Sequence, residues 1–126
     1  MCYNNTITGC SNTGNITNNC PVTANEYVGG FVGQIDMPGT NINPKTKITN
    51  CSYNAALSVK VASRQFSGAL IGRLTDKSTD ESASSVTGVI VKGSVAGTTL
   101  ASDNFKTLCY GVSSNKKPTD GVTLAE

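Results

Sequence analysis

The stretch Tyr27-Val-Gly-Gly-Phe-Val-Gly-Gln-Ile35 decides the fold, because the chain repeats it twice. It returns as Phe66-Ser-Gly-Ala-Leu-Ile-Gly-Arg-Leu74 and, more faintly, as Phe105-Lys-Thr-Leu-Cys-Tyr-Gly-Val-Ser113. The last glycines of the three copies are spaced by 39 residues at both steps, at Gly33, Gly72 and Gly111. An equal period of this size indicates one structural unit that is used three times.

The composition favours strands and tight turns over helices. Asn, Thr, Ser and Gly are abundant among the 126 residues, aromatic residues make up 6%, and Trp is absent. The 10 basic and 8 acidic residues nearly balance, which predicts no nucleic-acid partner. No apolar run approaches the roughly 20 residues of a membrane helix, so no membrane insertion is expected. Residues 1–6 lack the basic and apolar regions of a signal peptide, so a secreted form would take its signal from outside this sequence.

A second repeated segment precedes each glycine block. Each copy has an aliphatic residue first, Thr second and another aliphatic residue nine positions after the first; the copies start at Ile7, Ile48 and Val86. The third position is Gly, Asn or Gly, and these residues tolerate a positive φ. We therefore predict a bend at this position, which turns the residue after it toward the same interior as the first residue.

These repeats predict an all-β fold, a parallel β-helix (β-solenoid) of about three coils with loop inserts. Each glycine block is expected to be one strand, with Tyr27, Phe31 and Ile35 on the core face. Equivalent residues of successive coils would stack in ladders about 4.8 Å apart. The expected ladders are Ile7 with Ile48 and Val86, Cys10 with Cys51 and Val89, and Phe31 with Leu70 and Cys109. The alternative is a β-trefoil or other pseudo-threefold β fold, whose units have a similar length.

We expect a single repeat domain over residues 1–126, with coils at about 6–35, 47–74 and 85–113. Residues 114–126 are expected to form a C-terminal tail or cap. Coil ends expose unpaired strand edges, so a three-coil chain is expected to be a fragment of a larger protein or to associate with itself through those ends.

Two groups of side chains are candidates for a site. Val32, Ile71 and Tyr110 would stack into an apolar stripe on the outward face of the glycine block, where they would contact a partner unless an insert covers them. Cys10 and Cys51 would be stacked thiols about 5 Å apart, which is within disulfide range, and we expect them to be reduced more often than bridged. The chain has five cysteines, so at least one has no partner within the chain.

The sequence gives no support to a catalytic site. Because the chain has no His, the usual serine or cysteine triads and His-based metal centres are excluded. The eight acidic residues all lie in expected loops, turns or the tail, and none forms a known calcium-binding pattern. We therefore predict no catalytic residue, no metal and no cofactor, and a protein that is not an enzyme.

The chain resembles the GLUG-motif repeat proteins of bacterial surfaces. The family pattern, roughly Ile-x-Asn-Cys-x-Asn-x-Gly-x-Ile followed by Val-Gly-Gly-Ile-Val-Gly, is close to Ile7–Ile16 plus Val28–Gly33. Ile48–Leu57 plus Ser67–Gly72 matches it more loosely, and the resemblance covers about residues 6–113.

This resemblance implies a secreted, extracellular or cell-surface β-helical module that is not an enzyme. Its expected role is an adhesin-like binding surface or a structural spacer, with a host or matrix protein or a glycan as partner. One alternative is a carbohydrate-active β-helix enzyme that uses loop carboxylates, which a convergent pair of acids in one groove would favour. The other alternative is a spacer segment of a secreted protease.

Overall fold

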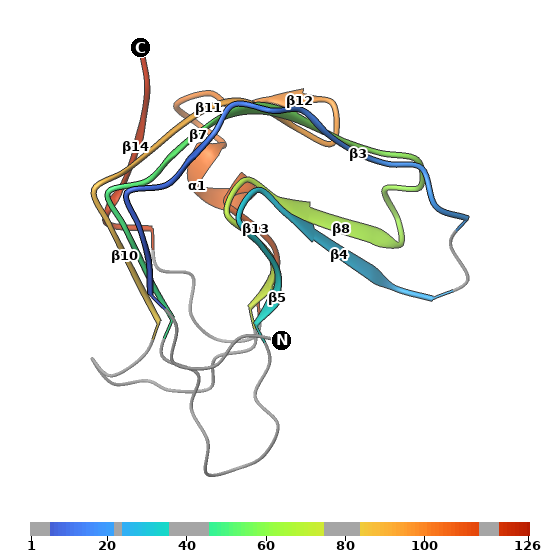
Figure 1. Ribbon diagram of the computed structural model, residues 1–126. Helices are drawn as coiled ribbons and strands as arrows, with labels where there is room; N and C mark the ends of the chain where they lie inside the picture. Colours follow the sequence, from blue (N-terminus) through green and yellow to red (C-terminus); the bar gives the residue numbers. More distant parts are fainter. Residues whose placement is uncertain (1–5, 22–23, 36–45, 75–83, 114–118) are drawn as a thin grey trace, which may run out of the picture.

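The computed structural model describes residues 6–21, 24–35, 46–74, 84–113 and 119–126 (Figure 1). The described chain is built from short strands and one helix of four residues, so the predicted all-β class is confirmed. Among the described residues, no helix combines the length and the apolar character that crossing a membrane requires.

The strands follow the three repeats. The first repeat contains β1 (Thr6–Thr8), β2 (Ser11–Asn12), β3 (Ile16–Asn18), β4 (Glu26–Gly29) and β5 (Val32–Ile35). The second contains β6 (Lys47–Thr49), β7 (Ser52–Val59), β8 (Gln65–Gly68) and β9 (Ile71–Leu74). The third contains β10 (Ser85–Thr87), β11 (Val89–Val95), β12 (Thr98–Thr99), α1 (Phe105–Leu108) and β13 (Tyr110–Ser113), and β14 (Val122–Leu124) follows it.

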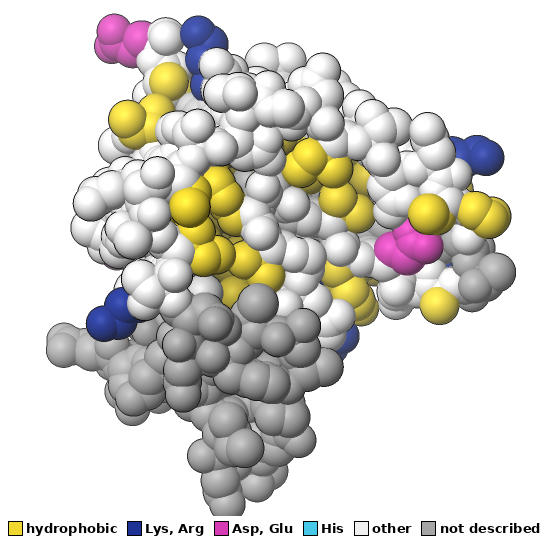
Figure 2. Space-filling model, in the orientation of Figure 1, with side chains coloured by type: hydrophobic (Ala, Val, Ile, Leu, Met, Phe, Trp, Pro, Cys, Tyr) yellow, Lys and Arg dark blue, Asp and Glu magenta, His cyan; other side chains and the backbone are white. Residues whose placement is uncertain are grey.

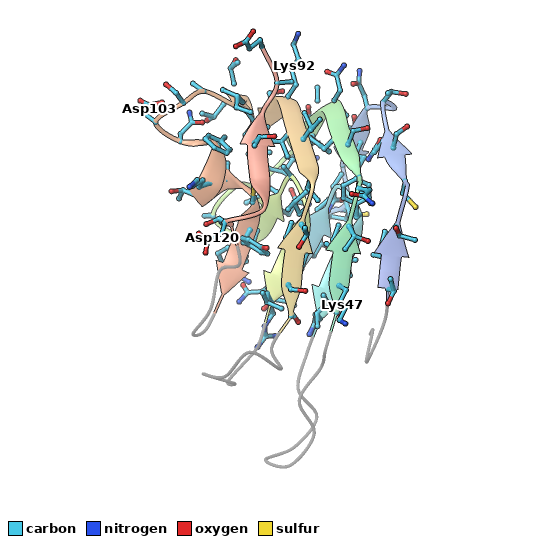
Figure 3. The ribbon with its side chains drawn as sticks, turned by 90° about the vertical axis from the view of Figure 1, so that its left-hand side faces the viewer. Lys47, Lys92, Asp103 and Asp120 are labelled. Atoms are coloured by element: carbon cyan, nitrogen blue, oxygen red, sulfur yellow. The ribbon has the colours of Figure 1, made fainter. Side chains whose placement is uncertain are left out.

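Equivalent strands of successive repeats pair in parallel. The described sheets have the orders β1-β6-β10 and β5-β9-β13, β4 pairs with β8, and β7 lies between β11 on one side and β2 and β3 on the other. Figure 1 shows the three repeats following nearly the same path, one behind another, and Figure 3 shows the strands of one side next to each other. Each repeat therefore hydrogen-bonds to its neighbour through several equivalent strands.

The register of this pairing matches the predicted ladders. Ile7 lies opposite Ile48, and Ile48 lies opposite Val86. The amide of Ser52 donates to the carbonyl of Cys10 at 2.9 Å, and the amide of Ile90 donates to that of Cys51 at 3.0 Å. Those two hydrogen bonds align positions 10, 51 and 89, so the ladder predicted there is confirmed.

The predicted bend before each long strand is confirmed. Gly9, Asn50 and Gly88 have φ values of 65°, 53° and 64°, all in the left-handed region. Gly lacks the Cβ that makes this region costly, and Asn tolerates it better than other residues with side chains. The bend separates β1, β6 and β10 from the strands that follow them.

The glycine block is not one strand, contrary to the prediction. In the first repeat it is β4 and β5 with a corner at Gly30 and Phe31, and in the second it is β8 and β9 with a corner at Ala69 and Leu70. The corner is so tight that a Cβ built on Gly29 would collide with the carbonyl oxygen of Val32. The two small residues ahead of Phe31 therefore allow the chain to turn where continuous alternation was expected.

The third copy of the glycine block departs from the other two. Only Tyr110–Ser113 forms a strand there, whereas Phe105–Leu108 forms α1 in place of a third copy of β4. Thr107 takes the place of Gly68, where an added Cβ would collide with the carbonyl oxygen of Ile71. A residue with a side chain cannot make the same corner, so the strand is lost at this point.

The apolar core is most complete in the middle repeat. Ile48, Leu57, Leu70 and Leu74 are at most 1% exposed. Tyr53 is also buried, and its hydroxyl donates a hydrogen bond to the carbonyl oxygen of Ser94 at 2.9 Å. The middle repeat has a repeat on either side, so its apolar side chains are covered from both directions.

Candidate functional site

The predicted contact stripe forms a ladder but lies inside the protein. Val32 pairs with Ile71 and Ile71 pairs with Tyr110, in the register that the 39-residue period predicts. Their side chains are only 8%, 1% and 3% exposed and belong to the core cluster. The prediction of an outward surface is wrong, because a corner before β5 and β9, and α1 before β13, interrupt the alternation that decides which residues face inward. These side chains are not available to a partner.

The two predicted thiols occupy adjacent repeats and differ in exposure. Neither Cys10 nor Cys51 is in a disulfide. The Cys51 thiol is 2% exposed and lies 3.2 Å from the carbonyl oxygen of Thr49 and 3.6 Å from that of Ile7. The Cys10 thiol is exposed and lies 3.5 Å from the carbonyl oxygen of Thr8. The ladder position is therefore the same in both repeats, but only the first repeat leaves it open to solvent.

A second buried thiol, that of Cys109, lies beside the buried Tyr110. Burial raises the pKa of the Cys109 thiol to about 12, and its sulfur lies 3.1 Å from the carbonyl oxygen of Phe105. Burial also raises the pKa of Tyr53 to about 12. The pKa of Tyr110 is raised mainly by burial and further by the neighbouring Cys109. These groups stay neutral at physiological pH, so Cys109 is a core residue and not a nucleophile.

Raising the pH above about 9 is expected to destabilise the fold. In the unfolded chain, Cys109 and Tyr53 ionise near their ordinary pKa values of 9.0 and 10.0, whereas in the folded chain each stays neutral up to about 12. The free energy of unfolding is therefore at its full value below pH 9.0 and falls as the pH rises toward about 12. Urea denaturation midpoints measured between about pH 7 and pH 11 check this.

Two substitutions show whether Cys109 carries part of that pH dependence. Cys109→Ala removes one titrating group, so the loss of stability between about pH 9 and pH 10 should become shallower. Cys20→Ser, at an exposed thiol, should leave the slope unchanged. An unfolding midpoint that stays constant up to about pH 11 would contradict the burial of these groups.

One cluster of partly exposed side chains was not predicted. Tyr27 and Phe66, from β4 and β8, stack with ring centroids 5.9 Å apart and an interplanar angle of 21°. The guanidinium carbon of Arg73, on β9, lies 5.0 Å from the centre of the Tyr27 ring, and its Nη1 donates to the Tyr27 hydroxyl at 3.4 Å. All three side chains are half-buried. We call Tyr27, Phe66 and Arg73 the aromatic–arginine cluster.

The corner in the glycine block explains why the sequence did not reveal this cluster. A single flat strand would place Tyr27 and Phe66 on the core face and Arg73 on the opposite face. The corner folds β4 back against β9, so that a Cβ on Gly72 would lie 2.5 Å from the amide nitrogen of Val28. Tyr27 is thereby brought next to Arg73, which the alternation pattern had placed on the opposite face of the strand.

The described acidic residues do not converge. Glu26 accepts hydrogen bonds from Gln65 at 2.9 Å and from Asn18 at 2.8 Å, and these, the Gln65 bond first, lower the pKa of its carboxyl. Figure 3 shows Asp103 and Asp120 well apart from each other and from Lys47 and Lys92. Within the described residues, no group of three or more His, Cys, Asp or Glu is placed to hold a metal ion. Asp36, Asp76, Asp80 and Glu81 lie outside the described residues.

Comparison of the chain with models of known protein families gave no match. Comparisons with curated proteins and with solved structures gave none either. The resemblance to GLUG-motif repeats, with the bacterial and extracellular setting that it implies, therefore stays a prediction that depends on the short motifs alone.

Proposed function

We propose that this chain is a non-enzymatic, extracellular or cell-surface module, built as a three-coil parallel β-helix that serves as a structural spacer. The observation that carries the proposal is the parallel pairing of equivalent strands through all three repeats. This pairing supports a coil over a β-trefoil or another pseudo-threefold fold, because such folds place the repeats around an axis and not in one column. A continuous ladder of this kind resists bending and keeps attached segments at a fixed separation.

The chemistry of the described side chains supports a spacer over the alternative of a carbohydrate-active enzyme. A general acid for glycoside hydrolysis needs a raised pKa and a second carboxyl group within about 5–10 Å. The carboxyl of Glu26 has a lowered pKa and is held by two amide side chains. The same reasoning fits a spacer segment of a secreted protease, which would perform no chemistry itself.

A rigid spacer can be recognised by the distribution of distances between two groups attached to its two ends. The module would be placed between a donor and an acceptor fluorescent protein, and time-resolved energy transfer would report their separation. We expect a single narrow distribution that broadens when urea unfolds the module, whereas a Gly/Ser linker of equal length gives a broad one throughout. A broad distribution for the native module would overturn the spacer proposal.

A second candidate function is adhesion, and the aromatic–arginine cluster is the observation that favours it. Half-exposed aromatic rings present flat faces to the C–H side of a sugar ring, and a planar guanidinium adds hydrogen-bond donors beside them. A glycan or a glycosylated host or matrix protein is the partner that fits this chemistry.

Screening on glycan and matrix-protein arrays, followed by two substitutions, tests adhesion. Phe66→Ala should weaken binding of any captured glycan by at least about tenfold, or about 1.4 kcal/mol. Lys92→Ala, at an exposed residue on β11, should have no such effect. Binding that both variants retain, or an array without any captured glycan, would mean that the cluster is only structural.

A further inference from the structure

Cys10 and Cys51 occupy equivalent positions in two neighbouring repeats, and hydrogen bonds join the two backbones on either side of them. Before the cysteines, the amide of Gly9 donates to the carbonyl of Thr49 at 3.1 Å. After them, the amide of Ser52 donates to the carbonyl of Cys10 at 2.9 Å. Neighbouring strands lie about 4.8 Å apart, and the Cα atoms of a disulfide are usually about 4.4–6.8 Å apart. The backbone is therefore spaced for a disulfide at this position.

The two side chains also point the same way. The Cys10 sulfur lies 3.5 Å from the carbonyl oxygen of Thr8, and the Cys51 sulfur lies 3.2 Å from that of Thr49. Thr8 and Thr49 pair in register, so each sulfur takes the same place in its own repeat. The Cys51 sulfur also lies 3.6 Å from the carbonyl oxygen of Ile7, so it already reaches toward the first repeat. Side chains that point the same way from this spacing can be bridged by rotation about χ1.

Exposure gives these two thiols different roles. Cys10 is exposed, so a small oxidant can reach it, whereas Cys51 is 2% exposed and is shielded from one. The other buried thiol among the described residues, that of Cys109, lies in the third repeat, and the second repeat separates it from Cys10. Cys51 is therefore the buried thiol that is placed to react with an oxidised Cys10.

We propose that Cys10 and Cys51 form a redox-controlled clamp between the first two repeats, which a small-molecule disulfide such as oxidised glutathione closes. The Cys10 thiolate first attacks the small disulfide, so that a mixed disulfide forms on Cys10 and one glutathione thiolate leaves. The Cys51 thiolate then attacks the Cys10 sulfur and displaces the second glutathione thiolate. The protons of the two cysteines pass to the two leaving thiolates. In total, two protein thiols are oxidised to one disulfide, and the small disulfide is reduced to two thiols.

The clamp would hold the repeat that has a neighbour on one side. Among the described residues, β1 to β5 pair only with strands of the second repeat. Figure 2 views the molecule from the side of the first repeat and shows apolar side chains uncovered between its strands. A cross-link between residues 10 and 51 would restrict the unfolded chain and so favour the folded one. The clamp needs the observed strand pairing and not the spacer function.

Oxidation of the full, folded, reduced chain with oxidised glutathione tests the clamp. Remaining thiols are then alkylated, and the chain is digested without reduction and analysed by tandem mass spectrometry. We expect a monomer whose mass has fallen by about 2 Da, with a single linked pair of peptides that joins Cys10 to Cys51. The urea midpoint of the bridged chain should exceed that of the reduced chain by about 1 M or more.

Two substitutions and an unfolded sample complete the test. Cys51→Ser should stop after the first step, with glutathione still attached to Cys10, whereas Cys20→Ser, at another exposed thiol, should bridge as the unchanged chain does. In urea the preference for Cys51 should disappear, because strand pairing no longer holds the two positions together. An unchanged chain that does not react, glutathione that stays on Cys10, a bridge from Cys10 to Cys2 or Cys20, equal preference in folded and unfolded chains, or an unchanged urea midpoint would each overturn the proposal.

Discussion

Replacing Gly72 with Ala is expected to destabilise the protein by about 3 kcal/mol, enough to unfold a domain of marginal stability. A Cβ at this position would lie 2.5 Å from the amide nitrogen of Val28 and 2.6 Å from the carbonyl oxygen of Gly33. Both are backbone atoms of the first repeat, so no side chain can move aside to make room. The first and second repeats would have to separate, and urea denaturation monitored by circular dichroism measures the cost.

Gly14→Ala is the matched control for this substitution. The nearest atom to a Cβ there is the Asn12 Oδ1 at 4.0 Å, which is an ordinary contact distance. We expect a change within about 0.5 kcal/mol, because the added methyl group meets open space. If Gly72→Ala shifts the urea midpoint no more than Gly14→Ala does, the close approach of the first two repeats is not present in solution.

Truncating Leu57 to Ala is expected to cost about 2–5 kcal/mol, whereas the same truncation at Ile16 should cost about 1 kcal/mol. The two residues pair in one ladder, so they share the same local geometry. Leu57 is 0% exposed because a repeat lies on either side of it, whereas Ile16 is half-buried. The difference between the two costs measures how much the second neighbouring repeat contributes.

Equilibrium urea unfolding of both variants at low protein concentration provides the comparison. Equal losses at the two positions would show that the first repeat is covered as fully as the second, against the arrangement described here.

Much of the strand register could be predicted from the spacing of equivalent residues. Parallel strands in neighbouring repeats must align residue for residue, so the offset of 39 between Gly33 and Gly72 also aligned Val32 with Ile71. The bends were predictable as well, because a positive φ restricts the choice of residue at Asn50 and its equivalents. These features depend on local chemistry that recurs in each copy.

Which residues of the glycine block face the core could not be predicted in the same way. Alternation specifies which side a residue faces only while a strand stays continuous. The pair Gly29-Gly30 is compatible with a strand and with a corner, and the choice between them depends on contacts with Ala69 and Tyr53 in the next repeat. The wrong choice placed Val32, Ile71 and Tyr110 on the surface and concealed the aromatic–arginine cluster.

The pairing of β12 and β14 with β11 could not be predicted either, for a different reason. β12 and β14 have no counterpart in the described parts of the other repeats, so a comparison of repeats gives no signal for them. Residues 119–126 fall in the expected tail or cap, but their pairing with Val89–Val91 on β11 depends on the third repeat leaving that edge free.

The middle repeat presents matching hydrogen-bonding edges above and below: β6 aligns Ile48 with Ile7 on one side and with Val86 on the other. A duplicated copy of this repeat, inserted beside the original, would pair with the original on one side and with the first or the third repeat on the other, through the same strand edges. The molecule would grow by one strand spacing, about 4.8 Å, for every copy added. Its reach is thus a property that gene duplication can adjust in equal steps, without the need for a new kind of contact.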